Sequence, residues 1–69
     1  MPLSMAGLGE HFLIKKVSGK EETRRFLENL GFVAGAEVSV VSEIAGNVIV
    51  QVRDSRVAIS REMAQKIIV

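Results

Sequence analysis

The sequence contains no cysteine, no tryptophan, no tyrosine and only one proline. Without cysteine no disulfide can stabilise the fold, a composition that fits a protein of a reducing compartment. Long apolar runs are absent as well, because none approaches the roughly 20 residues that span a membrane. The first residues also lack the charged and apolar regions of a signal peptide. We therefore expect a cytoplasmic protein that is not inserted in a membrane.

Neither sign of charge is in clear excess, since nine Lys and Arg residues oppose eight Asp and Glu residues and leave a formal net charge of +1. A chain so close to neutral has no field that would hold a polyanion. The three aromatic residues are all Phe, too few for a stacking platform that binds single-stranded RNA. We expect no nucleic-acid partner. An RNA-binding module that uses Arg53, Arg56 and Arg61 is the less favoured alternative.

What the chain does have is apolar residues, which make up 48% of its 69 positions. This length and composition predict a single small domain, residues 1–69, built around one core. The first periodic segment, His11–Val17, alternates loosely and places Phe12 and Ile14 on one face of a strand. Self-association through strand edges is left open by the sequence.

A helix is expected to follow this strand. Ser18 and Glu21 have the spacing of a capping box, in which each side chain bonds the other residue's amide. The helix should cover Lys20–Leu30. Gly31 is placed to end it, because glycine readily adopts the positive φ of a helix C-cap.

The second half of the chain reads as a series of short strands and tight turns. Strands are expected at Glu37–Ile44, Val48–Arg53, Arg56–Ser60 and Ile67–Val69, with turns at Ala45–Asn47 and Asp54–Ser55 and one helical turn, capped by Ser60, at Arg61–Gln65. Five strands in so short a chain need a facing layer for their apolar sides. We therefore predict a mainly β fold, a small SH3-like barrel with a helix inserted after the first long strand. A helix lying across one sheet, an α+β sandwich, is the competing architecture.

Residues that could carry catalysis are nearly absent. His11 is the only imidazole, and its neighbour Glu10 should point to the opposite face of a strand, which makes a poor chelate. A transition-metal site normally needs three or four such ligands. The serines are better explained as caps and turn formers than as nucleophiles. We expect no enzyme activity and no cofactor, and at most weak divalent-metal binding through His11 and Glu10.

One cluster of apolar residues is a candidate contact surface for another protein. It lies on the helix and its exit turn and consists of Phe26, Leu27, Leu30 and Phe32, with the cations Arg24 and Arg25 beside it. A helix on a small barrel can turn only part of its circumference inward, so some of these side chains should be exposed to a partner. The competing interpretation is a helix fully docked on the barrel.

The order of these motifs resembles the FeoA family of small ferrous iron transport proteins. The resemblance rests on the run Arg24–Gly35, on Arg53–Ile59 after a Val-rich strand, and on the ending Ala64–Ile67. It implies an SH3-like barrel without enzymatic activity that contacts the membrane ferrous-iron transporter FeoB at its cytoplasmic GTP-binding domain. The alternative that the resemblance offers is a metal-binding or metal-sensing domain related to the C-terminal domain of DtxR-type repressors.

Overall fold

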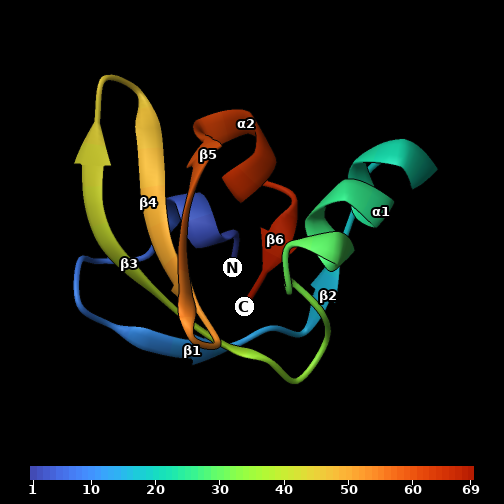
Figure 1. Cartoon of the computed structure of the whole chain (residues 1–69), viewed down its shortest axis with the longest axis horizontal. Coiled ribbons are helices and arrows are strands. Elements are labelled where there is room, and N and C mark those ends of the chain that lie inside the picture. Colours follow the sequence, from blue (N-terminus) through green and yellow to red (C-terminus); the bar gives the residue numbers. More distant parts are fainter.

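The computed structural model describes residues 1–69 and contains six strands and two α-helices (Figure 1). In chain order the elements are η1 (Leu3–Met5, a 3-10 turn), β1 (His11–Leu13), β2 (Lys16–Val17), α1 (Glu21–Asn29), β3 (Glu37–Ile44), β4 (Asn47–Val52), β5 (Ser55–Ser60), α2 (Arg61–Ala64) and β6 (Ile67–Ile68). The mainly β fold predicted from the sequence is confirmed, with six strands in place of five. Figure 1 shows α1 at the opposite side of the molecule from the hairpin of β3 and β4.

The strands form two antiparallel sheets that enclose one core. The larger sheet has the order β1-β3-β4-β5, and β2 pairs with β6 in the smaller one. The two ends of the chain lie together at the smaller sheet, where the Val69 amide donates to the Met1 carbonyl oxygen at 2.8 Å. Pro2 also forms a bridge with Ile68. The sheets and η1 together close a small barrel around the apolar side chains.

The segment predicted as one strand, His11–Val17, is divided between the two sheets. In β1, Phe12 lies opposite Val38, whereas Val17 of β2 lies opposite Ile67. The chain changes sheets at Ile14, which is buried and donates its amide to the Ala36 carbonyl oxygen at 2.9 Å. The single-strand prediction is therefore wrong, because this segment forms a corner of the barrel.

The two hairpins of the larger sheet use different turns. Ala45 and Gly46 connect β3 to β4, and their φ angles of 51° and 81° are those of the type I′ turn that matches the twist of a hairpin. The second loop lies at 53–54, one residue earlier than predicted, and Val52 pairs with Ser55. Relative to the predicted loop, the partner of each β4 residue on β5 therefore shifts by two positions rather than one. A shift of two keeps every side chain on its predicted face of the sheet.

The core is made mainly of the inward side chains of these strands. Its fully or nearly buried apolar members are Leu3, Ile14, Leu27, Phe32, Val38, Val40, Val48, Val50, Val52, Ile59, Ala64, Ile67 and Val69. The three valines of β4 alternate with less buried residues, as the sequence pattern predicts. Val57 and Ile59 of β5 lie opposite Val50 and Val48 and pack on the same side, which confirms the predicted face of this strand.

The predicted helix caps have different outcomes. Ser18 does not cap α1, because the smaller sheet holds it: its amide and its hydroxyl both donate to the Lys66 carbonyl oxygen, at 2.7 and 3.2 Å. The helix begins one residue later than predicted, at Glu21, after an N-cap Lys20 that makes no side-chain cap. The prediction of a capping box at Ser18 and Glu21 is therefore wrong. By contrast, the Ser60 hydroxyl accepts from the Met63 amide at 3.2 Å and caps α2 as predicted.

Candidate partner-binding surface

The end of α1 determines which of its apolar side chains are accessible. Gly31 has a φ of 108° and donates its amide to the Glu28 carbonyl oxygen at 2.9 Å. The Phe32 amide donates to the Leu27 carbonyl oxygen at 3.0 Å. These two bonds form a Schellman motif, in which the residue after the glycine packs against the last inward residue of the helix. The prediction that Gly31 ends the helix is confirmed.

This motif corrects part of the predicted contact surface. Leu27 and Phe32 are completely buried and belong to the core, so neither can contact a partner in this fold. Leu30 is partly buried and packs against the same core. The prediction that the apolar cluster of Phe26, Leu27, Leu30 and Phe32 supplies a contact surface is therefore wrong for Leu27 and Phe32, because the helix end folds these two side chains inward together.

The remaining predicted residues lie on the outer surface of the helix. Phe26 is 49% exposed, and Arg24 and Arg25 are exposed as well. With Leu27 directed inward, the helical spacing places Arg24 on one flank, Phe26 on the other and Arg25 outward. Arg25 is held by an ion pair with Glu21, one turn earlier, at 2.6 Å. We call Arg24, Arg25 and Phe26 the α1 surface.

A groove runs beside the α1 surface, between the helix, β2 and the segment that follows the helix. It has a volume of about 260 Å³ and is lined by Lys15, Lys16, Val17, Arg24, Glu28, Val33 and Ala34. Sequence reasoning placed Arg24 at a contact surface but missed both lysines. Their only signal was a basic pair directly ahead of the helix.

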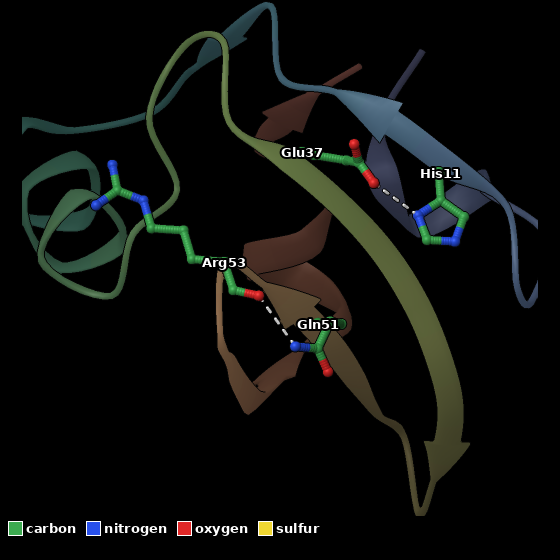
Figure 2. A network of polar contacts seen from close by, with 4 residues as sticks. All are labelled: His11, Glu37, Gln51 and Arg53. Atoms are coloured by element: carbon green, nitrogen blue, oxygen red, sulfur yellow. Dashed lines mark hydrogen bonds and ion pairs between the residues drawn. The ribbon is translucent and has the colours of Figure 1, made fainter.

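A second hollow, of about 350 Å³, lies on the outer face of the larger sheet and is mainly polar. There His11 of β1 and Glu37 of β3 point toward each other, with 2.9 Å between His11 Nδ1 and Glu37 Oε1 (Figure 2). Figure 2 also shows Gln51, whose amide nitrogen donates to the Arg53 backbone carbonyl oxygen at 3.0 Å. Both His11 and Glu37 are about two-thirds exposed, so water screens their interaction.

The two residues considered for metal binding are not brought together. Glu10 accepts a hydrogen bond from the Gly7 amide at 2.9 Å and thereby closes its own turn. The carboxylate beside His11 is Glu37, which the sequence did not single out. No group of three or more His, Cys, Asp or Glu side chains that could hold a metal ion occurs in the chain. No helix is long and apolar enough to cross a membrane.

Comparison with known proteins identifies the family. The sequence profile of the FeoA domain matches residues 1–69. The chain belongs to the FeoA family. This FeoA chain is 32% identical over 68 residues to the Fe(2+) transport protein A of Methanocaldococcus jannaschii, and the match covers 99% of the chain and 83% of that protein. The family assignment that the motifs suggested is therefore confirmed, as is the link to ferrous iron transport.

Two solved structures have the fold of this FeoA chain, and one of them is described as an SH3 domain. The zinc-complexed FeoA of Stenotrophomonas maltophilia, described as a prokaryotic SH3 domain protein, superimposes with a TM-score of 0.87 at 28% identity, covering 99% of this chain and 87% of that one. A manganese-dependent transcriptional repressor superimposes with a TM-score of 0.87 at 20% identity, and the match covers 97% of this chain but only 39% of the repressor. The second similarity shows a shared fold alone.

Proposed function

We propose that this protein is a cytoplasmic accessory factor of ferrous iron uptake that binds the FeoB-type transporter at its cytoplasmic GTP-binding domain. Membership of the FeoA family supports the link to iron transport. The proposed action is protein contact rather than catalysis. Its residues are those of the α1 surface, Arg24, Arg25 and Phe26.

The observation that carries this proposal is the exposure of Phe26 on a helix that is anchored through Leu27. Phe26 leaves about half of its side chain in water, although burying an aromatic ring of this size in an interface is strongly favourable. Arg25 next to it and Arg24 on the other flank of the helix are suited to orient an acidic partner. A large apolar side chain that is exposed next to cations on an anchored helix is typical of an interface centre.

Calorimetry tests the proposal by measuring how tightly the purified chain binds the isolated cytoplasmic domain of the transporter. Phe26→Ala should weaken binding by about 2 kcal/mol, the size of an interface hot spot, and should leave the fold intact. Leu13→Ala is the matched control, because Leu13 is 63% exposed but lies on β1, away from the α1 surface. The proposal fails if the wild-type chain does not bind, or if the two variants bind equally well.

Metal sensing is the alternative that the family offers, and the residues present do not fit a resident transition-metal site. His11 and Glu37 supply only two possible metal ligands, and these two side chains contact each other. Transition-metal sites use three or four ligands. The zinc in the Stenotrophomonas maltophilia protein nevertheless motivates a direct test. Equilibrium dialysis with Zn²⁺ and Fe²⁺ should give weak binding at most. Tight binding that is lost in His11→Ala would favour the alternative.

A further inference from the structure

Three cations of the groove beside α1 have no partner within the protein. Lys15, Lys16 and Arg24 line the groove. Their side chains take part neither in the ion pairs Arg25–Glu21 and Arg61–Glu43 nor in the hydrogen bond between His11 and Glu37. Glu28 also lines the groove but forms no ion pair with them. The groove thus presents unneutralised positive charge to whatever enters it.

This charge is concentrated relative to the rest of the molecule. Three cations and the one carboxylate of Glu28 give the groove lining a formal charge of +2. The whole chain carries +1, so the remainder of the protein carries −1. A local excess of this kind in a concave site attracts negative groups more strongly than the same charges on a flat surface.

The rest of the groove lining is apolar. Val17 and Val33 are half-buried and Ala34 is exposed. No aromatic side chain lines the groove, so it offers nothing on which a nucleic-acid base could stack. Apolar side chains between cations instead suit a peptide in which acidic and aliphatic residues alternate.

We propose that this groove binds an extended acidic segment of a protein, with its carboxylates on Lys15, Lys16 and Arg24 and an aliphatic side chain against Val17 and Val33. This inference rests on the proposed function and adds the chemistry of the partner: the segment belongs to the cytoplasmic domain of the transporter. Because exposed charges on both sides carry the recognition, binding weakens as salt rises.

Charge reversal in the groove tests the proposal directly. Lys16→Glu and Arg24→Glu together should weaken binding of the transporter's cytoplasmic domain at least about tenfold at 50 mM salt. Lys16→Met, which removes the charge but keeps most of the apolar stem of the side chain, should weaken it about threefold. Arg56→Glu is the control, since Arg56 is exposed on β5 and bonds only Gln51. If the double variant binds as tightly as the wild type, the groove is not the binding site and the inference is overturned. In that case, weaker binding of Phe26→Ala would still support the proposed function.

Photo-crosslinking identifies what occupies the groove. A benzophenone side chain at Ala34, which is exposed in the groove, should crosslink to a segment of the transporter rich in Asp and Glu. The same group at Ala58, exposed on β5, should give no crosslink. A crosslink from Ala34 to a neutral or basic segment overturns the inference, as does binding of wild-type chain to RNA or to anionic lipid vesicles that the double variant loses. If the wild-type chain forms no complex, the inference and the proposed function both fail.

Discussion

The Phe32 amide donates to the carbonyl oxygen of Leu27 at 3.0 Å, and both side chains are completely buried. This bond joins the end of α1 to the segment that enters the barrel. It also explains why only part of the apolar cluster on the helix is accessible, since the motif that stops the helix turns two of the cluster's members inward. Phe26 stays outside because it lies about 100° around the helix from Leu27.

Truncating Leu27 should destabilise the whole fold. Leu27→Ala removes a side chain that is fully buried in the core, and such substitutions cost about 3 kcal/mol when the surroundings cannot collapse into the cavity. Urea denaturation followed by circular dichroism measures the loss. Leu13→Ala, at an exposed position, should change the free energy of unfolding by less than about 0.5 kcal/mol. Equal effects of the two substitutions would contradict the placement of Leu27.

Replacing Gly31 should weaken the same junction through the backbone. Gly31 has a φ of 108°, where an L side chain is strained, and we expect Gly31→Ala to lower the free energy of unfolding by about 1 to 2 kcal/mol. The added Cβ would lie 3.5 Å from Val52 Cγ2, an ordinary contact, so the loss would report the backbone conformation. An unchanged denaturation midpoint would show that α1 does not end at Gly31 in solution.

The turn between β3 and β4 should accept a stabilising substitution. Ala45 has a φ of 51° in a type I′ turn, a conformation that asparagine tolerates better than alanine. Ala45→Asn creates an Asn-Gly turn and should raise the free energy of unfolding by about 0.5 to 1 kcal/mol. Ala58→Asn, in the extended strand β5, should instead lower it. Thermal denaturation of the two variants and the wild type measures both effects. A melting temperature of Ala45→Asn below that of the wild type would refute the turn assignment.

The two serines predicted as helix caps should behave differently. Ser60→Ala removes the acceptor of the Met63 amide and should cost about 1 kcal/mol. Ser18→Ala removes only a bond to the Lys66 carbonyl oxygen in the smaller sheet. Amide hydrogen exchange of α1 should therefore be the same in Ser18→Ala and in the wild type once global stability is taken into account. Selective loss of protection in α1 would mean that Ser18 caps the helix after all.

The sequence pattern predicts correctly those features of the fold that depend on interactions between residues close together in the chain. The alternation of Val48, Val50 and Val52, the glycine at 31 and the cap at Ser60 each act over a few residues, and each was predicted correctly. The division of His11–Val17 depends on which sheet each half joins, and those partners lie more than 20 residues away. No alternation within the segment could reveal that corner.

The candidate site shows the same limit. Spacing alone places Phe26, Leu27 and Leu30 on one side of a helix, but the barrel decides which of them turns inward. Lys15 and Lys16 reach the flank of α1 only because the chain changes sheets before β2. The groove is therefore a product of tertiary structure and leaves little trace in the sequence.

The most direct test of the account is an NMR titration of the isotope-labelled chain with the unlabelled cytoplasmic domain of the transporter. We predict that amide signals of the α1 surface and of Val33 and Ala34 shift or broaden. Signals of His11, Gln51 and Arg56 on the outer face of the larger sheet should stay in place. Changes confined to that sheet face, or no change at a saturating concentration of the domain, would contradict the account.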